Sequence, residues 1–398
     1  MPRWLQFAIF LTVFFAIYGG AHLYVASRAA TMLDLPRGAA WWAARGIALF
    51  LAASFILVRV LLEWKMNSLT RAAYWGACLW MVFFLYLFLF SLVTHPVSLA
   101  LRLTGAGPRL AGLLGFPPDR LILALVTVVA TVLSAFAYRE ACCDPRVTRL
   151  DVPIKGGSAE LDGLTIVQIS DVHLGVIVDA ARMERIVQEI NALAPDLLVV
   201  TGDLMDENAD RLLELADPLT RVRARLGIWA VTGNHEYYAG AEQIVRHAAT
   251  IGIRFLQNEK AELPGGLLLY GMNDPTAASM GARRVPLEDV IGPEARERPA
   301  VLLYHQPRAE IARKAAALGI DLMLSGHTHR GQLWPLWYVG RRVFPYQTGT
   351  YVVGAMRLHV SRGIGTWGPP MRLGSPPEIV CIRLRASRPG PGGRPGTM

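Results

Sequence analysis

Residues 321–332 read DLMLSGHTHRGQ, and this stretch decides the fold class of the second half of the chain. Asp321–Leu324 is a short apolar segment of the kind that forms a buried strand, and two histidines follow it almost at once. In open α/β sheets the carboxyl ends of the strands form the crevice where ligands bind. The stretch therefore predicts a strand that delivers two imidazoles to such a crevice.

Earlier segments repeat this pattern, in which an apolar strand ends and a His, Asp or Asn follows. These segments are Leu164–Ser170 before Asp171-Val172-His173, Leu197–Val200 before Gly202-Asp203, Gly227–Val231 before Gly233-Asn234-His235-Glu236, and Val301–Tyr304 before His305. A helix is predicted over Asp179–Leu193 and another up to Leu318, because apolar residues recur there at helical spacing. Further strands are predicted at Leu267–Gly271, Val343–Gln347, Tyr351–Val360 and Glu378–Leu384. We expect an α/β domain over residues 150–385 and a disordered Gly-, Pro- and Arg-rich tail over 386–398.

The polar residues at these strand ends form a set typical of metal ligands. The candidates are Asp171, His173, Asp203, Asn234, His305, His327 and His329. Carboxylate, amide and imidazole groups without thiolate suit Mn, Fe, Zn or Mg, and seven ligands exceed the needs of one tetrahedral ion. The sequence therefore predicts two divalent ions, with one carboxylate between them because two close cations repel each other.

Local spacing supports convergence of these ligands. In extended backbone, residues i and i+2 point to the same side, so Asp171 with His173, and His327 with His329, can each serve one place. Glycines precede Asp203, Asn234 and His327, and they allow tight turns of the backbone.

The first 145 residues have a different composition. Four apolar runs, at about 5–25, 42–62, 74–93 and 121–138, are each near the ~20 residues that span a bilayer. The segment 96–115 is apolar but interrupted by Gly and Pro, and we do not count it as a span. An all-α transmembrane region of four helices is expected, and a lipid bilayer is its partner.

The charge of +9 follows the same division of the chain. Residues 1–140 hold 11 Lys and Arg against 4 Asp and Glu, and the remaining residues hold 29 against 27. Positive charge that flanks apolar runs is typical of membrane proteins, so no nucleic acid partner is expected. Counting Lys and Arg near the span ends gives seven on the side of the soluble domain and six on the other, which favours a cytoplasmic domain. The low Lys content, 4 against 36 Arg, suggests a GC-rich bacterial source and hence a bacterial inner membrane.

The ordered motifs DxH, GD, GNHE, H and GHTH resemble those of the calcineurin-like metallophosphoesterase superfamily, over roughly residues 160–385. The segment SGHTHRGQ at 325–332 is similar to that of its bacterial membrane-anchored members. The resemblance implies a four-layer α/β/β/α sandwich with a dinuclear site. It places Asp171, His173 and His329 on the first ion, Asp203 between the ions, and Asn234, His305 and His327 on the second. His235 would lie over the leaving group.

The expected reaction is attack of a metal-bridging hydroxide on phosphorus, with His235 as the proton donor to the departing oxygen. Arg330 follows the last ligand and is a candidate for binding the substrate phosphate; a solvated Arg is the alternative. Glu236 is a candidate for supporting the ligands, whereas Asp206 and Asn208 are interpreted as polar loop residues.

The predicted function is that of a membrane-anchored phosphoesterase acting on a phosphodiester or pyrophosphate, for which a lipid-linked phosphate is a natural substrate. The alternative is a membrane sensor or transporter with a non-catalytic domain of this type. Two features argue against the alternative: no ligand is missing from the motifs, and the apolar runs carry few internal polar groups. A protein or nucleotide phosphatase would share the same metal site.

Overall fold

The computed structural model describes residues 5, 9, 12–156, 159–206 and 208–386. The chain divides into two compact units, which are considered separately: Met1–Arg139 with Gly368–Met371, and Glu140–Trp367 with Arg372–Met398. From residue 387 onward, the tail predicted to be disordered lies outside the described residues.

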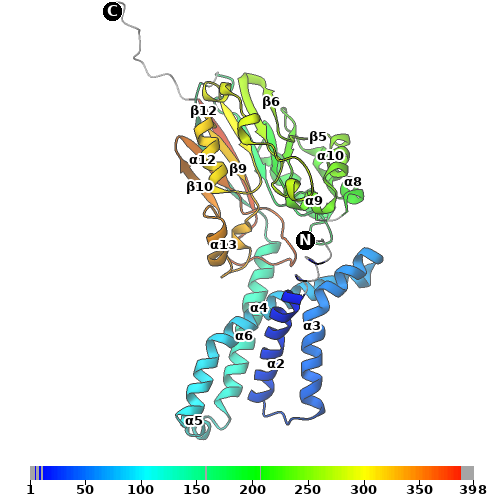
Figure 1. Cartoon of the computed structure of the whole chain (residues 1–398), viewed down its shortest axis with the longest axis vertical. Coiled ribbons are helices and arrows are strands. Elements are labelled where there is room, and N and C mark those ends of the chain that lie inside the picture. Colours follow the sequence, from blue (N-terminus) through cyan, green and yellow to red (C-terminus); the bar gives the residue numbers. More distant parts are fainter. Residues whose placement is uncertain (1–4, 6–8, 10–11, 157–158, 207, 387–398) are drawn as a thin grey trace, which may run out of the picture. The chain divides into compact units, whose positions relative to one another are not determined.

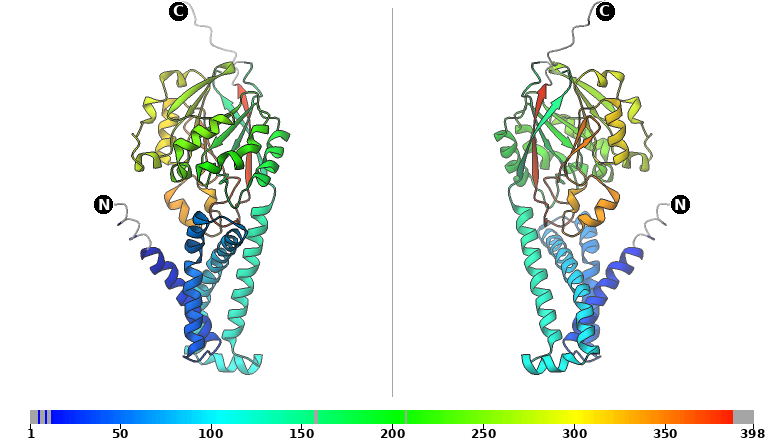
Figure 2. Two further views of the ribbon diagram at one scale, coloured as in Figure 1. Left: turned by 90° about the vertical axis from the view of Figure 1, so that its right-hand side faces the viewer. Right: turned by 90° about the vertical axis from the view of Figure 1, so that its left-hand side faces the viewer.

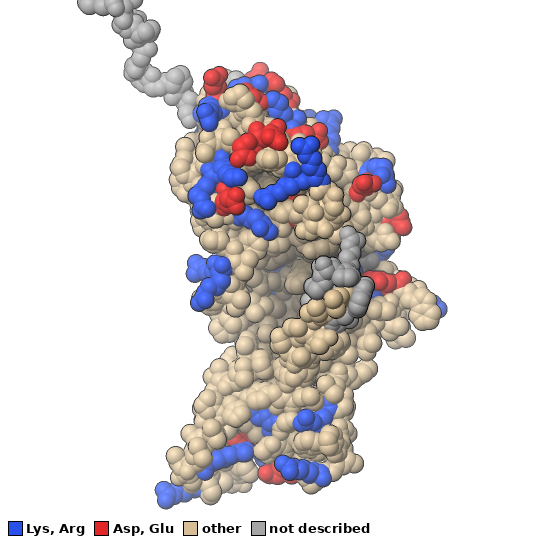
Figure 3. Space-filling model, viewed as in Figure 1, with Lys and Arg blue, Asp and Glu red and all other residues tan. Residues whose placement is uncertain are grey.

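The first unit is all-helical (Figure 1). Its elements are η1 (Phe15–Gly19), α2 (Gly20–Met32), α3 (Ala39–Trp64), α4 (Ser68–Leu103), α5 (Ala106–Leu114) and α6 (Pro118–Cys142). Among the described residues, α3, α4 and α6 are long and apolar enough to cross a membrane. On the face shown in Figure 3, charged side chains over these helices gather near the α5 end, beside a broad uncharged zone.

Two details of the four-helix prediction change. The run at 5–25 falls partly on residues that are not described, and its described part belongs to η1 and α2, neither of which is among the three candidate spans. The third run does not end at residue 93, because α4 continues through Pro96 to Leu103. Apolar helices tolerate a proline where their surroundings support the backbone. Gly105, with φ of 64°, then separates α4 from α5.

The helical unit also contains polar side-chain contacts between helices, one at a buried residue and one exposed, contrary to the expectation of few internal polar groups. His22 is 1% exposed, accepts a hydrogen bond from Trp80 Nε1 at 3.1 Å and stacks on Phe84. Nearby, Tyr24 bonds to His95 Nδ1 at 2.7 Å. The partners of His22 and Tyr24 lie 58 and 71 residues away along the chain, so the sequence did not show that these groups meet.

The second unit is built on two sheets that lie face to face (Figure 2). The first has the order β1 (Arg146–Ile154), β12 (Glu378–Ala386), β2 (Thr165–Ile169), β3 (Leu197–Thr201), β4 (Ile228–Val231) and β5 (Ile253–Phe255). The second has the order β10 (Gly349–Val353), β11 (Met356–Val360), β9 (Leu322–Ser325), β8 (Ala300–Leu303), β7 (Leu267–Gly271) and β6 (Glu259–Leu263). Strands β2 to β5 run parallel, as do β11, β9, β8 and β7.

Three apolar cores separate four layers. One core lies between the sheets and includes Ile166, Val199 and Leu303. A second packs α7 (Ala180–Ala192) and α10 (Ala241–Thr250) on the first sheet, and a third packs α12 (Ala309–Leu318) on the second. Strands buried on both faces read as continuous apolar runs, which is why β3 and β9 were recognisable in the sequence. The predicted α/β/β/α sandwich is confirmed.

The strand predictions fail mainly near the end of the chain. Val343–Gln347 is not a strand: Val343 is the last residue of α13 (Trp337–Val343), and Pro345 cannot donate to a sheet ladder. Tyr351–Val360 is a hairpin of two strands, β10 and β11, that turns at Gly354, where φ is 60°. Strands β1, β5 and β6 were not predicted from the sequence.

Candidate metal centre

The candidate ligands meet where the carboxyl ends of β2, β3, β4, β8 and β9 converge. Three groups of ligand atoms, each lying within 4.8 Å of one another, occur among the described residues. The first group is Asp171, His173 and His329; the second is Asp203, His305 and His327; the third is His173, Asp203 and His235. Asp203 belongs to the second and the third group, and its neighbour His173 in the third group also belongs to the first.

The backbone at these ligands is strained. Of the ten non-glycine residues with positive φ in the described chain, five are candidate ligands: Asp171, His173, Asp203, His327 and His329. Each such conformation costs about 1–3 kcal/mol and persists only when its surroundings impose it. The sequence predicted extended backbone for the pairs Asp171/His173 and His327/His329. This prediction is wrong, because all four residues have positive φ and adopt left-handed backbone conformations.

Two glycines are required by close approach rather than by a turn. A Cβ on Gly326 would overlap Ser170 Oγ and Asp171 Oδ2, and a Cβ on Gly233 would overlap the Asp203 side chain. The absence of a side chain at these positions lets one ligand loop pack directly on the next.

The first group is tightly interlocked. His173 Nε2 lies 3.0 Å from His329 Nε2, and His329 Nε2 lies 3.3 Å from Asp171 Oδ1. Asp171 Oδ1 also accepts the backbone N–H of His327 at 2.8 Å. The other oxygen, Asp171 Oδ2, is buried without a hydrogen-bond partner.

The second group is arranged around His305. Its Nδ1 donates to the Thr201 carbonyl at 2.7 Å, which leaves Nε2 as the nitrogen available to a metal. His305 Nε2 lies 3.0 Å from Asp203 Oδ2 and 3.2 Å from His327 Nδ1. Asn234 is 8% exposed at the start of α9 (Asn234–Ala239), and its Oδ1 is buried without a partner.

These contacts fit divalent cations. Two buried oxygens without hydrogen-bond partners, and pairs of imidazole nitrogens about 3 Å apart, are costly arrangements unless positive charge lies among them. Burial would lower the pKa of His305, but Asp203 raises it well above its usual value. A metal must therefore displace a proton there, which makes binding weaker in acid.

His235 and Asp206 form a pair beside the two groups. His235 Nδ1 lies 2.6 Å from Asp206 Oδ1, and the same oxygen lies 2.8 Å from His173 Nδ1. Burial favours a raised pKa for Asp206, but His173 and His235 hold it below its usual range, so the group is a carboxylate. The sequence analysis interpreted Asp206 as a loop residue; its position three residues after Asp203 was the only available signal.

Arg372 is a second residue that the sequence analysis missed. It is fully buried, donates to the carbonyls of Arg362, Gly365 and Ser375, and faces His329 Nδ1 at 3.1 Å. Burial lowers the pKa of its guanidinium to about 9. No local motif marks Arg372, because its partner lies 43 residues away.

Arg330, the candidate for phosphate binding, lies on the loop after β9 with φ of 51°. Its guanidinium stacks on Trp337 at 4.6 Å from the ring centroid. The contact covers one face of the guanidinium. Binding of the substrate phosphate by Arg330 stays a prediction.

Glu236 forms hydrogen bonds to two loops that carry candidate metal ligands. It is fully buried and accepts four backbone N–H groups, from Asp203, Leu204, Met205 and Gly233, at 2.6–3.1 Å. This network holds the loop after β3, which carries Asp203, against the loop after β4, which carries Asn234.

We expect Glu236→Gln to destabilise the metal-free protein by about 2–5 kcal/mol, because an amide NH₂ would face N–H donors that need an acceptor. Denaturant unfolding in a chelator measures the change. Glu214→Gln is the matched control, since Glu214 is exposed and forms a surface ion pair with Arg211. A loss below about 0.5 kcal/mol in Glu236→Gln would contradict this reading of the network.

Known proteins share this sequence pattern. The calcineurin-like phosphoesterase family matches residues 164–331. A transmembrane protein with metallophosphoesterase domain from Danio rerio is 31% identical over 352 residues, which is 85% of this chain and 79% of the relative. A Bos taurus protein of the same name is 35% identical over 277 residues, covering 66% of this chain and 62% of the relative. An uncharacterized metallophosphoesterase from Aquifex aeolicus is 36% identical over 225 residues, covering 56% and 85%.

The similarity to the Danio rerio protein extends over most of both chains, and the family match includes every strand end that carries a candidate ligand. The chain belongs to the calcineurin-like phosphoesterase family.

Proposed function

We propose that the protein is a membrane-anchored hydrolase that uses two divalent ions to cleave a phosphodiester or pyrophosphate. The observation that carries the proposal is the position of Asp203, whose carboxylate lies within reach of both ligand groups. Asp171, His173 and His329 would hold one ion, Asn234, His305 and His327 the other, and Asp203 both. The metal identities, from Mn, Fe, Zn and Mg, are left to the experiment.

When bound, the two ions lower the pKa of water and neutralise charge on the phosphoryl oxygens. The protein's own residues supply the remaining chemistry. Asp206 orients His173 and His235 through their Nδ1 atoms, and His235 keeps Nε2 for the leaving oxygen. Because the His235 side chain is 17% exposed, a substrate can reach it.

The three apolar helices support attachment to a bilayer, and a lipid-linked phosphate is the substrate class that such an anchor favours. We place the protein in a bacterial inner membrane with its α/β unit in the cytoplasm. Protease accessibility of that unit in oriented membrane vesicles tests the placement.

We expect the detergent-solubilised full chain to hydrolyse bis(p-nitrophenyl) phosphate only when loaded with metal. Removal of metal by EDTA should reduce the rate by more than about 100-fold, because the nucleophile and the charge neutralisation are lost together. Restoring Mn, Fe, Zn or Mg one at a time should recover activity with at least one of them. Absence of hydrolysis with all four would favour the alternative of a membrane sensor.

A further inference from the structure

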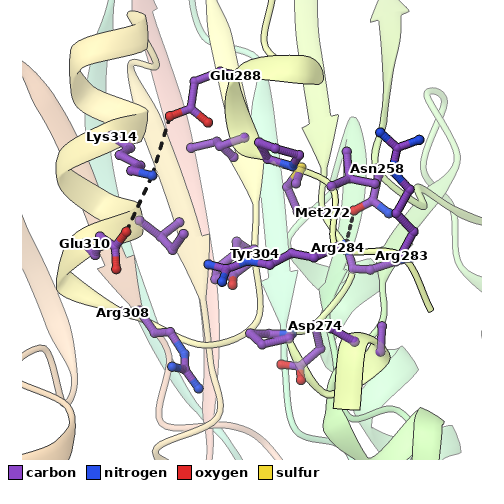
Figure 4. Close-up of a pocket in the computed structure, with 18 of the residues that line it drawn as sticks. Asn258, Met272, Asp274, Arg283, Arg284, Glu288, Tyr304, Arg308, Glu310 and Lys314 are labelled. Atoms are coloured by element: carbon purple, nitrogen blue, oxygen red, sulfur yellow. Dashed lines mark hydrogen bonds and ion pairs between the residues drawn. The ribbon is translucent and has the colours of Figure 1, made fainter. Parts of the chain in front are cut away.

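A cavity of about 700 Å³ lies in the α/β unit, and no candidate metal ligand lines it. Its walls come from the ends of β7 and β8, from α11 (Thr276–Ser279), from the loop that follows α11, and from α12. Figure 4 shows its charged side chains. The volume is in the range of small-molecule sites, about 300–1,000 Å³.

The cavity shares a strand with the metal centre. β8 ends at Leu303, Tyr304 lines the cavity, His305 is a candidate ligand, and Arg308 lines the cavity again. Arg308 therefore lies three residues along the chain from a candidate ligand of the metal centre.

Arg308 is held in place rather than freely solvated. Its Nε and Nη2 atoms both donate to Gln306 Oε1, at 2.9 and 2.8 Å. Gln306 is 5% exposed, and its Nε2 donates to Asp274 Oδ1 at 3.1 Å. This chain fixes the guanidinium and leaves its remaining N–H donors for another acceptor.

Two further arginines lie on the opposite wall. Arg283 and Arg284 are exposed, and Figure 4 shows Arg284 extending toward Tyr304. Within the described chain, no ion pair joins either of them to a carboxylate, whereas Glu288 and Glu310 both pair with Lys314. The lining therefore holds three arginines without a carboxylate partner among the described residues, and Asp274, whose Oδ1 accepts from Gln306 Nε2 and the Thr276 N–H rather than from a cation. Four basic side chains face three acidic ones, so the cavity carries a small positive excess.

We infer that this cavity binds a second phosphate group of the substrate, so that the preferred substrate is a pyrophosphate diester rather than a simple phosphodiester. Guanidinium groups recognise phosphate through paired N–H donors, and three arginines line this one cavity, of which Arg308 follows the candidate ligand His305 by three residues. The inference rests on the function proposed above. Hydrolysis adds one water across the P–O–P bridge and gives two phosphate monoesters, so the arginines would bind the phosphate that departs.

Binding is tested first, without catalysis. Inorganic pyrophosphate is titrated by calorimetry into the metal-free, detergent-solubilised full chain. We expect one site per chain, with affinity reduced at least about tenfold in Arg308→Gln and in the double variant Arg283→Gln/Arg284→Gln. Arg313→Gln, on α12 but outside the cavity, is the matched control and should bind like the unaltered chain. No binding, or equal binding by all variants, would overturn the inference.

The second test uses the metal-loaded protein. ADP-ribose and a dialkyl pyrophosphate are compared with bis(p-nitrophenyl) phosphate through the ratio of their kcat/KM values. In the arginine variants this ratio should fall at least about tenfold, and in Arg313→Gln it should not change. Turnover of ADP-ribose alone would assign the second phosphate to a nucleotide, and turnover of both would assign it to pyrophosphates in general.

The two proposals fail separately. If no substrate is hydrolysed but pyrophosphate still binds through the arginines, the proposed activity is wrong and the anion site stands. If bis(p-nitrophenyl) phosphate is hydrolysed and neither pyrophosphate is, the second-phosphate site is wrong and the hydrolase stands.

Discussion

Asp203→Asn is expected to abolish turnover and to lower the amount of bound metal. Asp203 is 2% exposed, its Oδ2 lies 3.0 Å from His305 Nε2, and its Oδ1 accepts the backbone N–H of His235 at 2.9 Å. An asparagine fills the same volume but removes the negative charge that we propose lies between two cations. Without that anion, two cations a few ångströms apart repel each other strongly.

We expect the rate to fall by more than about 100-fold, because replacing a metal ligand lowers activity more than replacing a residue that supports a ligand. Elemental analysis should show fewer than two ions per chain. Asp217→Asn is the control, because the Asp217 side chain is 58% exposed and forms a surface ion pair with Arg221, away from the candidate ligands. A variant with two ions and an unchanged rate would show that Asp203 does not bridge them.

His235→Ala is expected to retain both ions and to lose rate, by about 10²–10⁴-fold on substrates with poor leaving groups. The reason is geometric: Nδ1 is engaged by Asp206, so Nε2 is the atom that can give a proton to the departing oxygen. p-Nitrophenolate needs little protonation, so the loss should be smaller with bis(p-nitrophenyl) phosphate than with an alkyl phosphodiester.

The metal content of His235→Ala distinguishes a proton donor from a metal ligand. His235 also belongs to a group with His173 and Asp203 whose atoms are close enough to hold an ion. If His235→Ala loses metal, His235 is a ligand; if it keeps full activity on every phosphodiester tested, it is not catalytic. His247→Ala, on α10 and outside the site, controls for the loss of an imidazole.

The sequence predicted the central strands because they carry a strong local signal, whereas the four-layer sandwich was what the family resemblance implied. β2, β3, β8 and β9 are apolar on both faces and each ends at a polar motif, so neither periodicity nor long-range information was needed. Edge strands carry weaker patterns. The β6 sequence EKAEL is largely exposed and reads as loop, and it becomes a strand only by pairing with β7.

The apolar runs were visible for a similar reason, because the length and hydropathy of a helix that can cross a membrane are local properties. The end of α4 was not visible, since Pro96 normally signals an interruption and its surroundings decide whether a helix continues. The His22–Trp80 contact likewise joins helices that are far apart in the chain.

What the sequence determined by itself is the set of chemical groups and their attachment to strand ends. Residue type dictates which atoms can bind a cation, and the parallel sheet dictates which edge they share. What only the tertiary structure decided is which groups support that set. Glu236 at four N–H groups, Asp206 between two imidazoles and Arg372 behind His329 act through contacts made across the fold. Such roles depend on burial and distance, which the chain acquires only when the sheets and loops have packed.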